Sequence, residues 1–225
     1  MQAKIGKFTL RKVYLLPGLL GLTSIVSAAQ FEASYYWDDR TYNSITLQVS
    51  ARDLGAGFSV WGFTDFHGDQ ANAARRYDMT RSFSEYRLSN DRLGQWLHVK
   101  GLGVQLEFND ATAGNSDASW RTGLTWHIKT GPLWMLWRAF PLQGNANQQA
   151  SVAWNLRLHD RLHLSGFADA NVLSDKTVWV VEPQLNLRLL KPLWLLLEYR
   201  YHGFERLNPL LDGEGWALGL RYHLP

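Results

Sequence analysis

The sequence predicts an all-β protein, a transmembrane antiparallel up-and-down β-barrel of about twelve strands. Three observations point to this fold. Apolar and polar residues alternate with a period of two in most segments after residue 29, as in a strand with one apolar face. No apolar run in that region approaches the roughly 20 residues of a membrane helix. Short and long connections also alternate along the chain, which is typical of an outer-membrane barrel.

The first 29 residues are expected to be a cleaved secretory signal peptide, leaving residues 30–225 as the barrel. Four basic residues precede an apolar run over 15–26, and Ser27, Ala28 and Ala29 follow it. Pro17 and Gly18 interrupt the run, and it is too short for a membrane anchor.

Charge and composition exclude several classes of function. Residues 1–29 hold four of the 23 Lys and Arg and none of the 20 Asp and Glu, so the remainder is nearly neutral. A nucleic-acid partner therefore has no support. The chain has no cysteine, which excludes a disulfide framework, a thiolate metal site and a thiol nucleophile. We expect no metal and no cofactor.

The alternation marks twelve candidate strands. Trp120, Leu124 and Trp126 would share one face of such a strand while Arg121 and His127 share the other. Most runs are long enough to cross a bilayer at a tilt, which takes about 9 to 11 residues. The expected strands are residues 31–37, 42–52, 57–66, 81–89, 95–108, 118–128, 132–141, 149–158, 161–170, 177–190, 192–203 and 215–224.

The connections between these strands fall into two kinds. Tight joints are expected at 53–56, 90–94, 130–131, 159–160 and 191, and longer polar segments at 67–80, 109–117, 171–176 and 204–214. With an even number of strands, both termini lie on the short-turn, periplasmic side. A soluble β-sandwich is the alternative, but it would place charge on its outer surfaces rather than in an enclosed lumen. Pro183 within a strand is expected to require a local bulge.

An internal repeat divides the barrel into two pseudo-repeated six-strand halves. FSVWGFTDF at 58–66 returns as LHLSGFADA at 162–170, so that Gly62 aligns with Gly166. Four further weak matches follow in the same order at shifts near 100 residues. They pair 44–49 with 151–156, 85–89 with 182–186, 95–97 with 193–195 and 120–128 with 216–224. Matches that keep one order at drifting shifts indicate a duplicated unit with unequal loops.

The repeat also singles out candidate lumen residues. If the apolar sets face lipid, charged and aromatic side chains of the repeated segments point inward, and Asp65 and Glu85 are expected at similar height, as are Asp169 and Glu182. Carboxylates, arginine and amide donors and flat rings suit a polar, ring-bearing solute such as a nucleoside. The candidate solute-binding residues are Phe63, Asp65, Glu85, Arg87, Phe167, Asp169, Glu182 and Gln184. The alternative for each is a structural ion-pair network that holds the barrel round.

The chain after residue 29 resembles the Tsx-like nucleoside-specific outer-membrane channels and related small outer-membrane barrels. The motifs that carry the resemblance are FSVWGFTDF, LHLSGFADA, EYRLS at 85–89 and VEPQLNL at 181–187. The resemblance implies a twelve-stranded monomeric barrel in the bacterial outer membrane with a narrow, substrate-selective pore. The chain departs from those channels in its shorter loops and in ending with Tyr222-His223-Leu224-Pro225 rather than with an aromatic residue.

A lipid hydrolase is the alternative from another functional class. His163 and Ser165 have the His-x-Ser spacing of barrel phospholipases and would lie on one face of a strand. They are expected to face the lumen, whereas such an enzyme works at the lipid-facing wall. A closed barrel with a purely structural role is the third possibility. The sequence favours a non-enzymatic outer-membrane channel for passive diffusion of small polar solutes, with nucleosides as the leading candidates and membrane lipid and lipopolysaccharide as surroundings.

Overall fold

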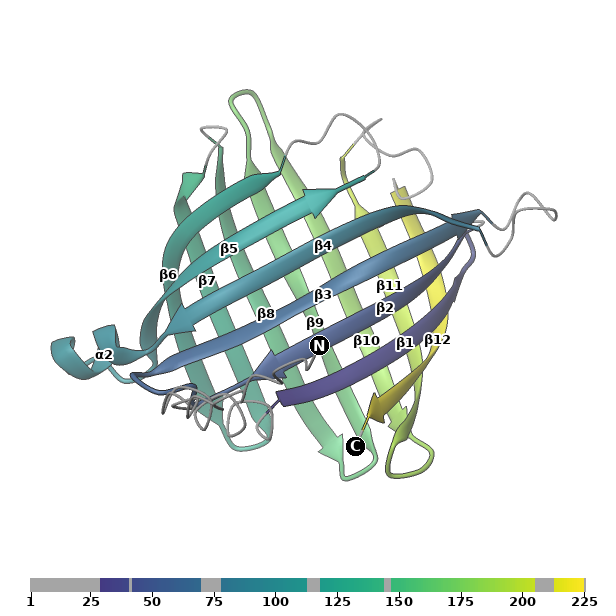
Figure 1. The fold of residues 1–225 in the computed structure, drawn as a ribbon, viewed down its shortest axis with the longest axis horizontal. Coiled ribbons are helices and arrows are strands. Elements are labelled where there is room, and N and C mark those ends of the chain that lie inside the picture. Colours follow the sequence, from purple (N-terminus) through teal and green to yellow (C-terminus); the bar gives the residue numbers. More distant parts are fainter. Residues whose placement is uncertain are drawn as a thin grey trace, which may run out of the picture.

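Twelve antiparallel strands close into a single barrel (Figure 1). The computed structural model describes residues 29–40, 42–69, 78–112, 118–143, 147–204 and 213–224, so that the expected signal peptide lies outside the described residues apart from Ala29. The strands are β1 (Ala29–Asp38), β2 (Tyr42–Ala51), β3 (Phe58–Asp69), β4 (Met79–Asn90), β5 (Leu102–Ala111), β6 (Ser119–Thr130), β7 (Leu133–Gln143), β8 (Gln148–His159), β9 (Leu162–Val172), β10 (Thr177–Arg188), β11 (Leu193–His202) and β12 (Gly213–Leu224).

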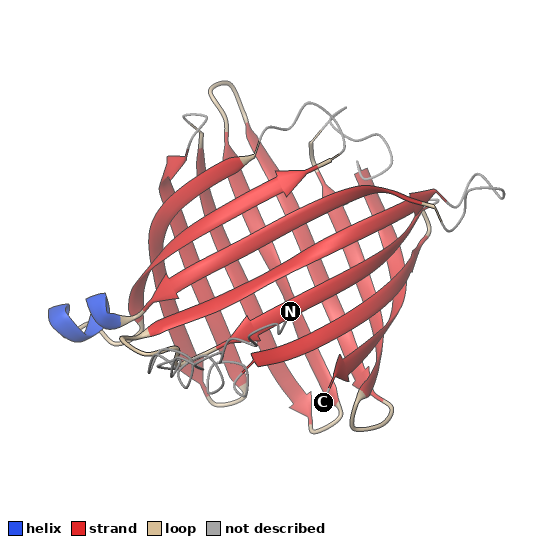
Figure 2. Cartoon of the chain, viewed as in Figure 1, coloured by secondary structure: helices blue, strands red, loops and turns tan. Residues whose placement is uncertain are grey.

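Each strand pairs with its neighbours in sequence, and β1 pairs with β12 to close the sheet. This confirms the predicted up-and-down topology. Strands account for nearly all of the regular structure (Figure 2). The start of β1 and the end of β12 lie at the same end of the barrel as the short connections (Figure 1), which we call the short-turn end.

One predicted strand was wrong at its beginning. The expected strand over 95–108 starts only at Leu102, and the chain before it forms the short helix α2 (Arg92–Leu97). His98 ends this helix in the left-handed conformation, with φ of 56°, and its backbone N–H points to the Gly94 carbonyl. The expected tight joint at 90–94 is therefore a helical connection that projects from the short-turn end (Figure 1).

The sequence repeat relates strands that lie six positions apart. The matched segments fall on β3 and β9, β2 and β8, β4 and β10, and β6 and β12, whereas 95–97 falls on α2. Gly62 and Gly166 occupy equivalent places because the neighbouring strand approaches each of them closely. A Cβ at Gly62 would lie 2.4 Å from the Tyr86 ring, and one at Gly166 would lie 2.3 Å from the Glu182 carbonyl oxygen. The glycine in both halves is thus required by packing.

Pro183 is accommodated without the expected bulge. It pairs with Gly166 on β9, and the register between β10 and β9 continues unbroken through it. On the other side, β10 has no partner positions on β11 between Val181 and Gln184. Since proline lacks an N–H, the ladder is interrupted on that side only.

The outer face of the barrel is apolar and carries aromatic residues near both rims. Trp37, Trp120, Trp179 and Trp216 are exposed near the end with the long connections. Phe31, Phe58, Trp126 and Tyr222 are exposed toward the short-turn end. Two aromatic girdles around an apolar band are typical of a barrel surface that faces lipid. No helix in the described ranges is sufficiently long and apolar to cross a membrane.

Candidate functional site

The lumen of the barrel is lined by charged and polar side chains, many of them buried. Strand alternation places these residues opposite the apolar outer face, as the sequence predicted. Glu107 is 1% exposed and Asp38 is 3% exposed, although both carry carboxyl groups. The lumen is therefore packed with side chains at these levels. They form two networks on opposite walls.

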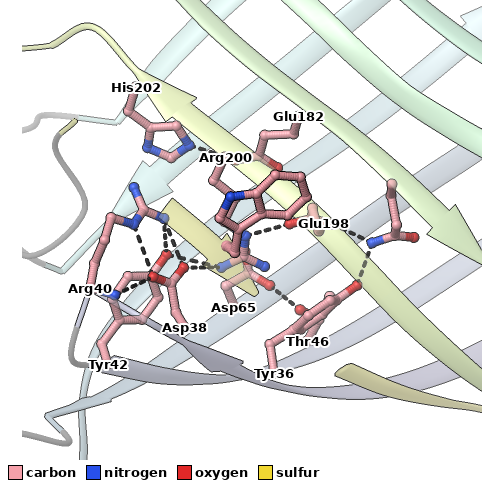
Figure 3. Close-up of polar contacts among 12 residues, drawn as sticks. Tyr36, Asp38, Arg40, Tyr42, Thr46, Asp65, Glu182, Glu198, Arg200 and His202 are labelled. Carbon is pink, nitrogen blue, oxygen red and sulfur yellow. Dashed lines mark hydrogen bonds and ion pairs between the residues drawn. The ribbon is translucent and has the colours of Figure 1, made fainter. Parts of the chain in front are cut away.

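The first network, which we call the Asp38 network, joins β1, β2 and β11 (Figure 3). Arg40 donates to Asp38 through Nε at 2.9 Å and through Nη2 at 2.8 Å. Arg200 Nη1 lies 3.3 Å from the same carboxylate and 2.9 Å from the Tyr42 hydroxyl, and its Nε donates to Glu198. Two guanidinium groups thus hold one fully buried carboxylate.

The Asp38 network continues toward the short-turn end through Gln184. Its amide nitrogen donates to the Tyr36 hydroxyl at 2.9 Å and to Glu198. Its amide oxygen accepts a hydrogen bond of 2.9 Å from Arg221 Nη2. Arg221 Nε in turn lies 3.6 Å from Glu32. These contacts connect β10 and β12 to β1 across the closing seam of the barrel.

Two further carboxylates lie beside the Asp38 network. Glu182 pairs with His202 at 2.5 Å, and Asp65 accepts a hydrogen bond of 2.5 Å from the Thr46 hydroxyl (Figure 3). Asp65 also interacts electrostatically with Arg200, which links β3 to this wall.

The second network, the Glu107 network, joins β4, β5 and β6. Arg87 Nε donates to Glu107 at 3.0 Å, and Arg121 Nε lies 3.1 Å from the other oxygen of that carboxylate. Gln105 and Asn109 donate amide hydrogens to Glu107 at 3.0 and 3.2 Å. Arg87 also pairs with Glu85 and stacks over the Trp61 ring with 4.3 Å to its centroid.

Arg138, whose charge interacts with Glu85 and Glu107, extends the Glu107 network to β7, β8 and β9. Arg138 donates to the Ser151 hydroxyl at 3.1 Å through Nε and at 2.5 Å through Nη2. Ser151 donates to Asp169, which lies 3.8 Å from Arg138. Thr46 with Asp65 and Ser151 with Asp169 are facing pairs on β2 and β3 and on β8 and β9. Each half therefore contains a hydroxyl-to-carboxylate hydrogen bond at the repeated aspartate, although the sequence match of 44–49 with 151–156 aligned Ser151 with Ser44 rather than with Thr46.

The structure divides the eight predicted solute-binding residues between the two walls. Glu85, Arg87 and Asp169 belong to the Glu107 network, and Gln184 belongs to the Asp38 network, with Asp65 and Glu182 beside it. Phe63 contacts Trp61 and Phe83, with ring centroids 5.4 and 5.7 Å apart. Phe167 faces Glu182 across the ladder. The eight predicted residues therefore do not form one compact site.

The carboxylates that were expected at similar height in the lumen are offset along their strands. Glu85 lies opposite Phe63, while Asp65 lies opposite Phe83. Glu182 likewise lies opposite Phe167, while Asp169 lies opposite Val180. Each carboxylate pair is therefore separated by one pleat, and the offset is the same in both halves.

Several central residues were not among the predicted site residues. Glu107, Arg138 and Arg200 occupy inward positions of their strands, but alternation alone does not reveal that they are buried. Asp38 was missed because the strand was expected to end at residue 37. Its partner Arg40 lies in the connection to β2.

The His163 and Ser165 pair faces the lumen close to the short-turn end. Asn186, which lies opposite His163 on β10, donates a hydrogen bond of 2.9 Å to the Ser165 hydroxyl. The His163 ring packs edge-on against Trp194, with centroids 5.3 Å apart. The serine hydroxyl is thus held by an amide donor, and the imidazole contacts an indole.

Comparison with known proteins places the fold among outer-membrane barrels. No family model and no curated protein matches the chain. Among solved structures, the KdgM porin superimposes with a TM-score of 0.56 at 11% identity, covering 87% of this chain and 99% of that chain. The NanC porin gives 0.54 at 10% identity, with 88% and 100% covered. The outer membrane phospholipase A from Escherichia coli gives 0.52 at 13% identity, with 88% and 90% covered.

These similarities confirm the predicted fold class. Two of the similar structures are porins and the third is an enzyme on a similar barrel, so the fold alone does not decide between these activities. Membership of the Tsx-like family stays a prediction. The chain has the closed twelve-strand architecture of bacterial outer-membrane barrels.

Proposed function

We propose that the protein is an outer-membrane channel for passive diffusion of small polar solutes, with nucleosides as the leading solute class. The observation that carries the proposal is the contrast between the two faces of one closed sheet. The outside is apolar with aromatic girdles, and the inside is charged and polar along the length of the strands. The similarity to the KdgM and NanC porins supports a channel role.

The two networks would narrow the passage to small solutes. Arginine and carboxylate side chains from opposite walls occupy the middle of the lumen and are held by ion pairs. A solute must then pass along side chains rather than through a wide aqueous pore. Weak contacts spread over several positions favour permeation because each can be released in turn.

The wall of the lumen also contains polar atoms without an internal partner. Asn109 Oδ1, Gln149 Oε1 and Arg138 Nη1 are buried and have no hydrogen-bond partner in the part of the chain that the structure describes. Phe63 on β3 and Phe167 on β9 add one flat apolar surface in each half. Sugar hydroxyls would bond to carboxylate and amide groups of the lumen wall, and a base would stack on the rings.

A swelling assay on proteoliposomes tests the proposal. Vesicles containing the purified protein should swell faster in isotonic uridine or adenosine than in a sugar of similar size. The combined variant Asp65→Ala and Asp169→Ala should change the nucleoside rate while the heat-modifiable barrel stays folded. Glu214→Ala is the matched control, because this exposed carboxylate bonds to Tyr199 at the rim. Absence of swelling in every solute would contradict the channel and favour a closed structural barrel.

Lipid hydrolysis is the second candidate, and one observation favours it. Asn186 lies beside His163 and Ser165, so a serine, an imidazole and an amide meet on two neighbouring strands. All three face the lumen, away from the surface where lipid would lie. Purified protein should release no fatty acid from phospholipid vesicles. Release that Ser165→Ala abolishes would instead establish the enzyme.

A further inference from the structure

Four inward cations gather at the short-turn end of the lumen. Even-numbered strands run toward this end, so residues at their C-terminal ends share one rim. Arg52 follows β2, Lys129 lies near the end of β6, Arg157 near the end of β8 and Arg188 at the end of β10. We call these four residues the basic mouth.

Contacts confirm that the basic mouth faces the lumen. Arg157 lies opposite the lumen-facing His163 across the β8 and β9 ladder. Arg188 lies over the ring of Trp194, with 5.7 Å to its centroid, and Trp194 packs against an inward cluster that contains Tyr36. Arg52 interacts electrostatically with His127, which shares the inward face of β6 with Lys129.

The basic mouth differs from the networks because its cations form no ion pair with a neighbouring carboxylate that the structure describes. None of its four residues forms an ion pair with another residue in the described ranges. Asp53, Asp91 and Asp160 are on connections at the same rim, and Asp91 and Asp160 interact electrostatically with His127 and His163 without forming an ion pair with the four cations. Glu32 is already engaged by Arg221 and by His223. The mouth therefore retains positive charge that a ligand can neutralise.

A cavity lies at this mouth and adds aromatic and amide groups to the charge. Its volume is about 340 Å³. Its lining residues are Arg52, Lys129, Gly131, Pro132, Leu133, Trp134 and Asn155. Two cations can bind an anionic group, an indole can stack on a ring, and an amide can bond to its polar edge. These are the groups of a small pocket that orients a ligand by a few polar contacts.

We propose that the basic mouth is a binding site for small organic anions, solutes that carry a phosphate or a carboxylate on a ring-bearing body. The physiological role of this site rests on the proposed channel function. The site refines that function because it defines the charge of the solutes that the short-turn end attracts. A mouth with an excess of one charge sign and low-dielectric walls concentrates ions of the opposite sign. The four residues would draw anions to that end of the lumen and hold them weakly.

Binding is tested without reference to conduction. Equilibrium dialysis of the folded protein should show retention of adenosine monophosphate and of glucuronate, while neutral adenosine binds more weakly. A variant with Arg52, Lys129, Arg157 and Arg188 all changed to Gln should bind the two anions about tenfold less tightly, because one charge-assisted contact contributes a factor of that size. Inorganic phosphate as a competitor distinguishes a phosphate site from a carboxylate site.

A matched control separates this site from the general charge of the rim. Arg92, Lys100, Arg161 and Lys191 are on α2 and on the connections of the same end, outside the strand positions that line the lumen. Changing these four to Gln removes the same charge and should leave anion binding unchanged. Equal loss in both variants, or no anion retention by the parent protein, would overturn the proposed site.

Ion selectivity separates failure of the site from failure of the channel. In a salt gradient across a planar bilayer, the parent should show a reversal potential that favours anions, and the basic-mouth variant should lose it while the control variant keeps it. Anion binding without any current would retain the site and contradict the channel. Current with cation preference and no anion binding would retain the channel and contradict the site.

Discussion

The middle of the lumen and its short-turn mouth both contain cationic side chains, but those in the middle are ion-paired and those at the mouth are not. In the Asp38 and Glu107 networks, each arginine lies within ion-pair distance of at least one carboxylate. At the basic mouth, Arg52, Lys129, Arg157 and Arg188 have no such partner among the described residues. Burial follows this division at its extremes, since Arg138 is 4% exposed and Arg52, Lys129 and Arg157 are exposed, whereas Arg188 is half-buried.

The difference indicates which charges hold the barrel and which can serve a ligand. A buried charge must be paired, because removing it from water costs several kcal/mol. An exposed cation needs no partner, and it can exchange water for a ligand at small cost. The networks are therefore expected to control stability and passage, and the mouth is expected to control which ions enter.

The largest expected effect comes from breaking a network at its centre. Glu107→Ala leaves Arg121 without its carboxylate and Arg87 with Glu85 alone. We expect the free energy of unfolding to fall by about 3 to 5 kcal/mol, because removing one partner leaves buried charge uncompensated. Urea unfolding of the protein in lipid vesicles measures this. If the free energy of unfolding falls no more than it does when an exposed residue is substituted, the network does not stabilise the barrel.

The same measurement on the basic mouth sharpens the contrast. Arg157→Gln and Arg188→Gln should leave the urea midpoint unchanged, since neither residue has an ion pair to lose within the described ranges. Their effect should be confined to anion selectivity. A destabilisation as large as that of Glu107→Ala would erase the distinction between the two regions.

A more modest effect is expected from the aromatic wall of the mouth. Trp134→Ala should weaken the binding of adenosine monophosphate about fivefold, because stacking of one base on a ring contributes roughly 1 to 3 kcal/mol. Binding of inorganic phosphate, which has no ring, should not change. Equal losses for both ligands would show that the substitution disturbs the pocket rather than the stacking contact.

The smallest expected effect is that of Ser165→Ala. The hydroxyl accepts one hydrogen bond from Asn186, and both residues lie at the wall of the lumen. Conductance and nucleoside flux should stay within error of the parent protein. A large change in flux would place this serine among the solute contacts.

The strands were predictable because one face of each had to be apolar and the other polar. That constraint appears as a period of two in the sequence, and it correctly assigned the outward Trp126 and the inward Arg121. Helix α2 was not predictable in this way, because Trp96 and Leu97 are exposed there and follow no strand face. The repeat located the glycines but could not show that Tyr86 packs over Gly62.

The networks were predictable only in part. Alternation indicates which face a side chain occupies, but it does not indicate its partner. Asp38 and Arg200 are brought together by closure of β1 on β12, far from each other in sequence. The distinction between paired and unpaired arginines therefore required the geometry of the closed barrel.

Single-channel recording of the purified protein in a planar bilayer tests the central claim most directly. We expect discrete conductance steps that adenosine or uridine reduces at low millimolar concentration and that a neutral sugar does not. A folded, heat-modifiable barrel that shows no conductance steps would contradict the channel and leave the two networks as the structural filling of a closed barrel.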